Sequence, residues 1–494
     1  MFKKILIANR GEIAVRIIRS CREMGINTVA LYIESDRRSL HVRLADECIR
    51  LRSARDLFDP VELLRIAQDS SVDAIHPGYG FMSEEAYFIR ACEAAGITFI
   101  GPPADVIEPL RSKIHTLNLA REAGFVTTKH SPISFGDENL GEIGPAAEEL
   151  GYPVIIKSCS GGRGRGARLA YSAGHLQEAV RQTQAIGYAI YGNPRVYLEK
   201  AILPAYQVGV QILADKAGNL IHLGEREGSV LQKGHKIVEE APAPCLNQEQ
   251  RERLWKTAVA LGRHFKYQNL GTVEFLIDEA GEFYFTEFKS RIQVQHPLTE
   301  QLNRIDLVRE QIVIAAGKPL SLRQEDIQLD GWSMMCRVRA NDPWRDYLSS
   351  PGHLRRVRLP GGPQVRVDTY IYCGCDVPAE FGPLLANLTV WGPNRDLCLR
   401  RMERALQDFT IIGTPTNLPM LQRIVAEPDF VQGNYSTGFQ VALVDEPADK
   451  EDGHLADLAV AAAVLYLHHN QMVHPQNSQR LQGGWHRSSR RLPQ

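Results

Sequence analysis

A glycine-rich loop lies between two apolar runs in the segment PVIIKSCSGGRGRGARLAY, residues 153–171. Because glycine has no Cβ, the backbone N–H groups of such a loop can close around phosphate oxygens. No Gly-Lys-Ser/Thr follows, which excludes a Walker A loop, and the next residues have the pattern of a strand rather than the helix of a Rossmann turn. We favour a β–loop–β flap over a nucleotide. A plain glycine-rich hairpin and an RG-type contact with RNA are the alternatives.

A second segment, GTVEFLIDEAGEFYFTEFKSRIQVQHP (271–297), has the pattern of a β-hairpin that collects carboxylates. If Asp278 pairs with Phe283 across a four-residue turn, Glu274 lies directly opposite Glu287. Two facing carboxylates are unfavourable unless a cation lies between them, and their oxygens suit Mg²⁺ shared with substrate phosphates. A solvated hairpin with its charges on the outer face is the alternative. Both glutamates are embedded among aromatic and aliphatic residues, which favours the metal site.

The second strand of this hairpin also predicts a row of polar groups on one face. Side chains alternate between the two faces of a strand, so every second residue points the same way. If the strand stays extended, one face carries Glu287, Lys289, Arg291, Gln293 and Gln295.

Short apolar runs alternate with helical patterns before these motifs. Strands that are nearly all apolar are typical of a parallel sheet covered on both faces, so the first ~110 residues predict an open α/β domain. The predicted strands there are 4–8, 28–33, 72–76 and 98–100, with helices at 12–24, 60–69 and 84–95. A connecting helix at 105–123 leads to a small α+β lid with strands 153–157, 167–171 and 196–200 and a helix at 175–187.

The predicted domains are an N-terminal α/β domain (1–112), a lid with the glycine flap (113–203), a larger α+β domain with long hairpins (204–446) and a tail (447–494). In the tail, the apolar stretch 455–467 predicts a docking helix, and the polar end is expected to be disordered. No run approaches the ~18 apolar residues of a membrane span, and the first residues are too polar for a signal peptide. We therefore expect a cytoplasmic protein without membrane insertion.

Composition excludes several classes of function. The 494 residues carry a formal net charge of −1, which gives no general attraction to nucleic acid. Nine cysteines without a C-x-x-C pair argue against a disulfide framework and against a structural zinc site. Any binding of phosphate must therefore come from local sites.

Six motifs in one order, from the first residue to about 445, resemble biotin carboxylase, the ATP-grasp subunit of acetyl-CoA and related acyl-CoA carboxylases. They are ILIANRGEIAVRIIR, HPGYGF-x-SE, GYPVIIK, KIVEEAPAP, RIQV and GTPTN. The resemblance implies an ATP-grasp fold and an ATP-dependent ligase, with a link to fatty acid biosynthesis. ATP would phosphorylate bicarbonate to carboxyphosphate, and biotin would capture the CO₂ that this releases.

The resemblance also implies a role for each matching residue. For ATP it implies Lys113, Lys157, Gly162, Arg163, Gly164, Gly166, Glu199, Lys200, Ile202, Gln207 and Leu276, of which Leu276 packs on the purine. For bicarbonate it implies Lys236, Arg291, Gln293 and Val294, and for biotin Tyr79 and Arg337. The metal ligands are Glu274 and Glu287, with Lys289 in place of a third ligand, and the catalytic group is Lys236, Arg291, Gln295 and Arg337.

Several positions depart from the family pattern. Gln295 stands where the family has a glutamate base, and an amide cannot take up a proton at physiological pH, a loss that typically costs ~10²–10⁴ in rate. Lys289 stands where the family has an asparagine that ligates metal, and its repulsion of Mg²⁺ at ~5 Å is about 6–7 kcal/mol. Lys289 must either swing away or replace one of two metal ions. The other departures are Arg163, Gln207, Leu231, Gly234 and the segment 381–387.

Three hypotheses follow. The first is an active biotin carboxylase subunit, slowed because its base is missing. The second is an impaired ATP-binding paralogue that acts as a regulatory or scaffold subunit, and the third is an ATP-grasp ligase with another acceptor. No Met-Lys-Met segment occurs, so biotin is expected on a separate carrier protein. The resemblance implies a biotin carboxyl carrier protein and carboxyltransferase subunits as partners, and a homodimer.

Overall fold

The computed structural model describes residues 1–160, 166–441 and 459–466. The chain divides into two units, Met1–Val441 and Ala442–Gln494. In the second unit, residues 459–466 form a helix with exposed apolar side chains, Val460 and Leu465 among them. This helix lies inside the apolar stretch predicted for the tail, and its docking role stays a prediction. The polar end that was expected to be disordered lies outside the described residues.

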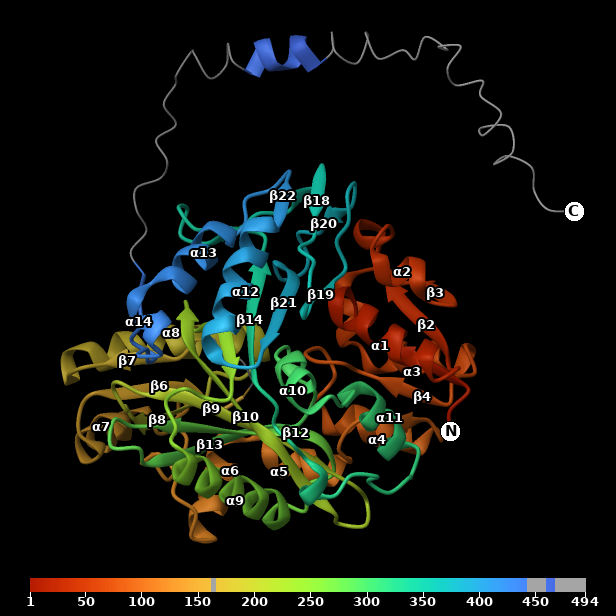
Figure 1. Ribbon diagram of the computed structural model, residues 1–494. Coiled ribbons are helices and arrows are strands. Elements are labelled where there is room, and N and C mark those ends of the chain that lie inside the picture. Colours follow the sequence, from red (N-terminus) through yellow and green to blue (C-terminus); the bar gives the residue numbers. More distant parts are fainter. Residues whose placement is uncertain (161–165, 442–458, 467–494) are drawn as a thin grey trace, which may run out of the picture. The chain divides into compact units, whose positions relative to one another are not determined.

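The N-terminal part of the first unit is a parallel sheet with the strand order β3–β2–β1–β4–β5 (Figure 1). Its strands are β1 (Lys4–Ile7), β2 (Asn27–Tyr32), β3 (Glu47–Arg50), β4 (Ala74–His76) and β5 (Thr98–Phe99). Its helices are α1 (Gly11–Glu23), α2 (Leu40–Leu44), α3 (Pro60–Asp69) and α4 (Ala86–Ala94). The four predicted strands are present. Strand β3 was not predicted, because it is an edge strand whose residues are mostly exposed and lack the apolar pattern.

The small lid is an antiparallel sheet of three strands in the order β7–β6–β8. It consists of β6 (Val154–Ser158), β7 (Arg168–Ala170) and β8 (Val196–Lys200), with α7 (Ile143–Leu150) and α8 (Ala173–Tyr191). The described residues on both sides of the glycine loop are therefore strands, as the flap interpretation requires. Gly162, Arg163 and Gly164, the residues at its tip, lie outside the described residues.

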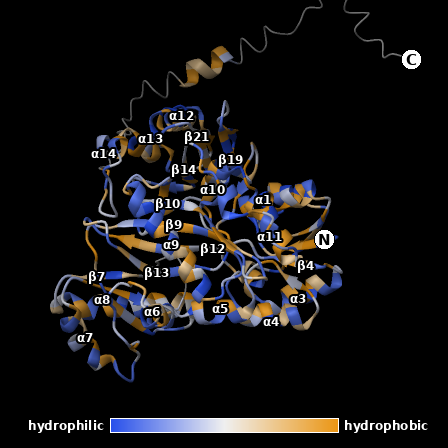
Figure 2. Ribbon diagram, turned by 60° about the horizontal axis from the view of Figure 1, so that its bottom comes forward, coloured by the Kyte–Doolittle hydropathy of each residue, from blue (hydrophilic) through white to orange (hydrophobic). Residues whose placement is uncertain are grey.

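One long antiparallel sheet dominates the rest of the first unit, in the order β13–β12–β9–β10–β11–β14–β21–β19. Three two-stranded sheets accompany it, formed by β15 (Asn341–Asp342) with β16 (Leu348–Ser349), β17 (Gly352–His353) with β20 (Asp376–Val377) and β18 (Arg356–Arg358) with β22 (Thr410–Ile412). Its strands are β9 (Tyr206–Ala214), β10 (Leu220–Gln232), β11 (His235–Ala241), β12 (Asn269–Ile277), β13 (Phe283–Lys289), β14 (Trp332–Arg339), β19 (Val365–Thr369) and β21 (Leu384–Gly392). Its helices are α9 (Gln248–His264), α10 (His296–Asn303), α11 (Leu307–Ala315), α12 (Arg395–Asp408), α13 (Leu418–Ala426) and α14 (Pro428–Gln432). Hydrophobic stretches lie both in the strands of this sheet and in the N-terminal part (Figure 2).

The connection before the lid is not the single helix that was predicted at 105–123. The structure has two helices, α5 (Ala104–Arg111) and α6 (Lys113–Glu122), which meet at Ser112. Ser112 has an extended backbone, and its hydroxyl accepts a hydrogen bond from the N–H of His115, so it caps α6. The prediction was wrong because apolar spacing runs through both helices and does not show the cap. The break puts Lys113 at the first position of α6.

A buried ion network joins the N-terminal part to the large sheet. Glu300 of α10 accepts hydrogen bonds from Arg16 of α1 at 2.8 Å and from Arg366 of β19 at 2.6 Å. Arg16 also pairs with Asp306, with Nη2–Oδ1 at 2.7 Å, and Arg366 also pairs with Asp368, with Nε–Oδ2 at 2.8 Å. Burial raises the pKa of Glu300, but the two guanidinium groups outweigh it and hold that pKa at about 2. Three segments far apart in the sequence therefore meet at one carboxylate.

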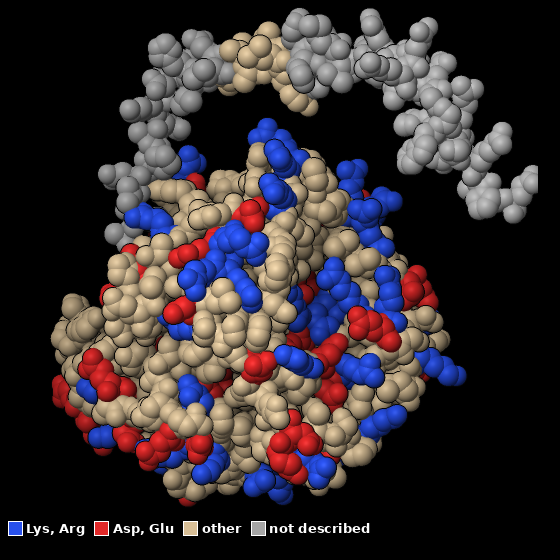
Figure 3. Space-filling model, in the orientation of Figure 1, with Lys and Arg blue, Asp and Glu red and all other residues tan. Residues whose placement is uncertain are grey.

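No helix among the described residues is long and apolar enough to cross a membrane. Positive and negative side chains are interspersed over the face shown in Figure 3.

The Glu300→Gln variant should lower the free energy of unfolding by about 3 kcal/mol at pH 7, because two buried guanidinium groups lose their shared carboxylate. The unfolded carboxyl has a pKa near 4.5, so the stabilisation is fully present above that pH and is lost as the pH falls through about 2. Urea unfolding of both proteins between pH 7 and 3 checks this, with the exposed Glu122→Gln as control. A difference between wild type and variant that stays constant down to pH 3 contradicts it.

Candidate active site

The two hairpin glutamates lie opposite each other, as predicted. Strands β12 and β13 are antiparallel, and Glu274 pairs with Glu287. The strand register next to the turn differs from the prediction, because Ile277 and not Asp278 lies opposite Phe283. A β-bulge at Thr286 restores the register, and the Thr286 hydroxyl donates to the carbonyl of Glu274 at 3.0 Å. The bulge therefore decides that the two carboxylates face each other.

Each of these glutamates has its own lysine. Lys289 Nζ lies 2.7 Å from Glu287 Oε1, and Lys236 Nζ lies 3.1 Å from Glu274 Oε2. Burial raises the pKa of Glu287, but Lys289 and then Lys113 outweigh it and hold that pKa at about 2. Burial also raises the pKa of Glu274, and Lys236 is the main group that lowers it below its ordinary value. Lys289 therefore remains at the hairpin in this structure, paired with Glu287.

A second ion pair lies in the lid. Lys157 of β6 contacts Glu199 of β8 with Nζ–Oε2 at 2.8 Å. The Glu199 carboxylate also accepts from Thr128 at 3.1 Å and from Tyr197 at 2.6 Å. Burial raises the pKa of Glu199, but Lys157 and these donors lower it below its ordinary value. Burial lowers the pKa of Lys113, while its interaction with Glu287 opposes that shift. The charges of Lys289, Lys113 and Lys157 all lower the pKa of Glu287.

A chain of hydrogen bonds connects the predicted bicarbonate and base residues. Gln293 donates to Glu274 Oε1 at 2.8 Å, and Gln295 donates to Gln293 Oε1 at 3.2 Å. Arg337 donates to Gln295 Oε1 at 3.1 Å and to Glu239 Oε2 at 2.6 Å. The strand does not stay extended as predicted, because β13 ends at Lys289 and α10 begins at His296. The loop between them still brings both glutamines to the hairpin.

Arg226 of β10 is the site residue that sequence reasoning missed. It is 2% exposed and donates to Gln293 at 2.8 Å, to Thr272 at 2.9 Å, to Gln211 at 2.7 Å and to Thr299 at 2.6 Å. Burial lowers its pKa to about 10, so it stays charged at neutral pH. A lone arginine in a polar strand carries no sequence signal of this role. It fixes Gln293 with a buried positive charge.

Arg291 and Tyr79 lie where the N-terminal part approaches this network. Arg291 Nε donates to Glu84 Oε2 at 3.1 Å, and the backbone N–H of Ser290 donates to the other oxygen of Glu84 at 3.0 Å. The Tyr79 hydroxyl is buried and has no hydrogen-bond partner among the described residues. An orphaned hydroxyl of this kind is a group that a polar ligand could satisfy.

The remaining predicted nucleotide residues are placed as follows. Gln207 and Leu276 pair across β9 and β12, and both are half-buried. Lys200 donates its Nζ to the carbonyls of Gly151 and Tyr152 at 2.8 and 2.9 Å, so its side chain is engaged within the lid. The others are the half-buried Ile202, Gly166 with a positive φ of 87°, and the half-buried Val294 of the bicarbonate group.

Gly234 has a local explanation that needs no ligand. Lys233 and Gly234 have φ of 48° and 74° between the paired residues Gln232 and His235. Positive φ at both central positions is the geometry of the two-residue turn that joins twisted antiparallel strands, and it favours glycine. Gly234 therefore serves the hairpin of β10 and β11.

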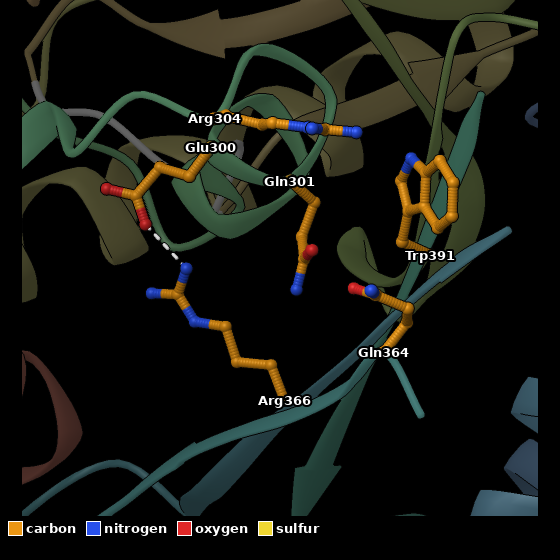
Figure 4. A pocket seen from close by; sticks show the side chains of 6 residues that line it. All are labelled: Glu300, Gln301, Arg304, Gln364, Arg366 and Trp391. Atoms are coloured by element: carbon orange, nitrogen blue, oxygen red, sulfur yellow. Dashed lines mark hydrogen bonds and ion pairs between the residues drawn. The ribbon is translucent and has the colours of Figure 1, made fainter. Parts of the chain in front are cut away.

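A separate cavity of about 430 Å³ lies at the other end of α10 (Figure 4). It contains none of the predicted site residues. Its lining residues are Glu300, Gln301, Arg304, Gln364, Arg366 and Trp391. The ion pair of Glu300 and Arg366 is part of its wall, so this cavity belongs to the joint between the domains and not to the hairpin site.

Comparison with known proteins decides the family. Family models match three consecutive parts of the chain: "Biotin carboxylase, N-terminal domain" at 1–107, "Carbamoyl-phosphate synthase L chain, ATP binding domain" at 113–323 and "Biotin carboxylase C-terminal domain" at 335–441. The chain is 43% identical to Biotin carboxylase 1 of Bacillus subtilis over 449 residues, which cover 89% of this chain and 98% of that protein. This chain belongs to the biotin carboxylase family.

Solved structures of biotin carboxylases agree with the fold. The biotin carboxylase domain dimer of Hydrogenobacter thermophilus 2-oxoglutarate carboxylase, in complex with MgADP, ADP and bicarbonate, superimposes with a TM-score of 0.86 at 39% identity, covering 88% of this chain and 96% of that one. The Campylobacter jejuni biotin carboxylase superimposes with a TM-score of 0.85 at 34% identity, covering 88% and 98%. The predicted ATP-grasp fold with its N-terminal α/β domain is therefore confirmed.

In this member of the family, the Arg226→Lys variant should lower the free energy of unfolding by about 1–3 kcal/mol, because an ammonium has three donors and leaves one of four buried acceptors unsatisfied. Urea unfolding measures the change. Arg65→Lys, at an exposed arginine that pairs only with surface carboxylates, is the control and should leave the midpoint where it is. An Arg226 variant as stable as this control would show that the four hydrogen bonds do not act as described.

Proposed function

We propose that this protein carboxylates biotin, with ATP and bicarbonate as co-substrates and carboxyphosphate as the intermediate. The observation that carries the proposal is the continuous network from the paired hairpin glutamates through Gln293 and Gln295 to Arg337. This network supports the proposal because facing carboxylates suit a metal ion and an arginine beside them suits developing negative charge. Family membership supplies the reaction class, an ATP-dependent ligase.

The described residues fit a magnesium site. Glu274 and Glu287 present facing carboxylates, which are the ligands that Mg²⁺ prefers beside substrate phosphates. Mg²⁺ bound there would offset the charge of the ATP phosphates. Lys113 and Lys157 are proposed to contact the same phosphates as point charges. The role of the glycine flap is a proposal of the same kind, and its tip lies outside the described residues.

The bicarbonate step is proposed to use positive charge on two sides. Lys236 and Arg291 would hold the bicarbonate anion, and Gln293 and Val294 would position it. Arg337, which also contacts Glu239, would stabilise the oxygen of biotin as its ureido nitrogen becomes nucleophilic. The buried Tyr79 hydroxyl, which has no partner among the described residues, is the proposed contact to biotin from the N-terminal domain.

The adenine end of the site is proposed at the hinge between the lid and the large sheet. Glu199, Lys200 and Ile202 would meet the base through the backbone, because the two charged side chains are already engaged. Leu276 would pack on the purine, with its cross-strand partner Gln207 beside it.

Gln295 limits the rate that this site can reach. An amide cannot remove the bicarbonate proton, so the position supplies hydrogen bonds but no base. Its oxygen already faces Arg337, as a carboxylate oxygen at the same position would. Because Gln295 is an amide and not a base, the site also favours a second candidate function, an ATP-binding regulatory or scaffold subunit that does not turn over. The ligase for another acceptor has no observation of its own in its favour.

The partners of this protein are also proposals, and they rest on its family membership. The Hydrogenobacter thermophilus neighbour is a dimer, and we propose a homodimer for this chain. A biotin carboxyl carrier protein and carboxyltransferase subunits are the other proposed partners. In the changed segment 381–387, the ring of Phe381 lies under the guanidinium of Arg10 at 4.1 Å, so it packs within the same chain. The cytoplasmic location stays a prediction.

The purified protein should hydrolyse ATP slowly in the presence of bicarbonate, and biotin should stimulate the hydrolysis. The Gln295→Glu variant should raise the biotin-dependent rate by roughly 10² or more, because it restores a base. The new carboxylate would accept a hydrogen bond from Arg337, which now donates to Gln295 Oε1 at 3.1 Å, and this cation lowers the carboxyl pKa, so the group is ionised and available as a base at neutral pH. Steady-state ATPase assays at several pH values measure both effects.

Gln301→Glu makes the same change at the other end of α10 and should leave the rate unchanged. If wild type and Gln295→Glu both bind ATP by thermal shift but neither turns over, the regulatory subunit replaces the carboxylase as the better account. Absence of ATP binding would remove both.

A further inference from the structure

The charge balance around the hairpin glutamates carries an inference beyond the proposed function. Glu274 and Glu287 contribute two negative charges, and each already has an ammonium partner. Lys236 pairs with Glu274 at 3.1 Å and Lys289 pairs with Glu287 at 2.7 Å. The pair of carboxylates is therefore neutral before any metal ion is counted. A site of this charge attracts divalent ions less strongly than two free carboxylates would.

Lys289 is a fixed part of the hairpin rather than a flexible surface cation. It is 8% exposed, and it is the last residue of β13, where it pairs with Thr272 of β12. Its neighbour Phe288 packs in the core with Phe265 and Phe285, which holds this end of the strand. A buried ammonium that left Glu287 would have to find other partners or reach water at a cost. We therefore expect Lys289 to remain at Glu287 when substrate binds.

The position of Nζ excludes a metal ion from one carboxylate oxygen. Magnesium bound to an oxygen lies about 2.0–2.1 Å from it. Nζ stands 2.7 Å from Glu287 Oε1, which is the space that such an ion and its other ligands would need. An ammonium also cannot act as a ligand. One divalent ion can still bind at the other oxygen of Glu287, and Glu274 can join it through the second lone pair of Oε1, whose first lone pair accepts from the neutral amide of Gln293 at 2.8 Å.

We infer that this protein holds its nucleotide with one divalent ion, and that the ammonium of Lys289 supplies the second cation as a built-in countercharge to the phosphates. The inference rests on the proposed function in one respect, that the site binds ATP. Lys289 is thereby a positioning residue for phosphate whose charge does not depend on the concentration of free metal. Lys113 and Lys157, which also act on Glu287, extend the same field of fixed positive charge.

Counting bound Mn²⁺ tests this inference. The full-length protein is saturated with a non-hydrolysable ATP analogue and titrated with Mn²⁺, and bound ions are counted by electron paramagnetic resonance. We expect one Mn²⁺ per nucleotide and no spin coupling in wild type. In Lys289→Asn, whose amide oxygen is a ligand, we expect two ions with the coupling of a pair about 4 Å apart.

Metal-free binding gives a second readout. With chelator present, wild type should still bind ADP, whereas Lys289→Asn should bind it roughly tenfold or more weakly, because one charge contact to phosphate is lost. The control is Lys4→Asn, which removes a lysine–glutamate pair of the same 2.7 Å length from the N-terminal sheet. It should change neither the ion count nor the affinity.

Two Mn²⁺ ions in wild type overturn the inference without any variant, so poor folding of Lys289→Asn cannot rescue it. A folded Lys289→Asn that still holds a single ion also overturns it. The count uses a non-hydrolysable analogue, so absence of biotin-dependent turnover, which is the failure of the proposed function, leaves the ion count readable.

Discussion

Electrostatic repulsion between Glu274 and Glu287 is the constraint around which the site is built. Two carboxylates at roughly 5 Å repel each other by about 3 kcal/mol at an effective dielectric of 20. Lys236 and Lys289 offset this repulsion, each by an ion pair with one of the two glutamates. The bulge at Thr286 sets the register that places the two glutamates opposite each other. The same arrangement that needs cations is therefore suited to the phosphates and metal ion of ATP.

The buried guanidinium of Arg226 fixes the position of Gln293, the residue that donates to Glu274. Arg226 is buried among neutral acceptors and has no carboxylate hydrogen-bonded to it among the described residues. Such a charge is costly to bury, and its four hydrogen bonds offset part of that cost. Gln293 accepts one of these bonds. Its amide N–H donates to Glu274, and its amide oxygen also accepts from Gln295. A fixed dipole network of this kind needs little rearrangement when negative charge develops.

Helix α10 links this network to the joint between domains. Gln295 precedes its first residue, and Glu300, one and a half turns later, takes part in the ion network with Arg16 and Arg366. The position of Gln295 thus depends on contacts made by α1 and β19. A change in the ion network of Glu300 with Arg16 and Arg366 would therefore be transmitted to Gln295 through α10. The hydrogen bonds around Gln295 form a complete supporting structure, which is why placing a carboxyl group at this position is a meaningful experiment.

The motifs along the chain were enough to predict the family, the parallel N-terminal sheet and the three strands of the α+β lid. The pairing of Glu274 with Glu287 was predicted correctly but through the wrong turn register, because the sequence does not show the bulge at Thr286. These features depend on local apolar patterns, on glycine chemistry and on alternation along one hairpin, all of which are present in short segments. The edge strand β3 and the break at Ser112 were not predicted, because an exposed edge and a single cap leave no apolar signal.

Only the tertiary structure decided which partners the charged side chains take. The sequence left Lys289 with two choices, and the fold paired it with Glu287. Arg226 had no sequence signal at all, since its four acceptors come from β9, β12, α10 and the loop before α10. Hydrogen bonds and ion pairs of this kind join segments distant in the sequence, so their geometry exists only after the strands have taken their register.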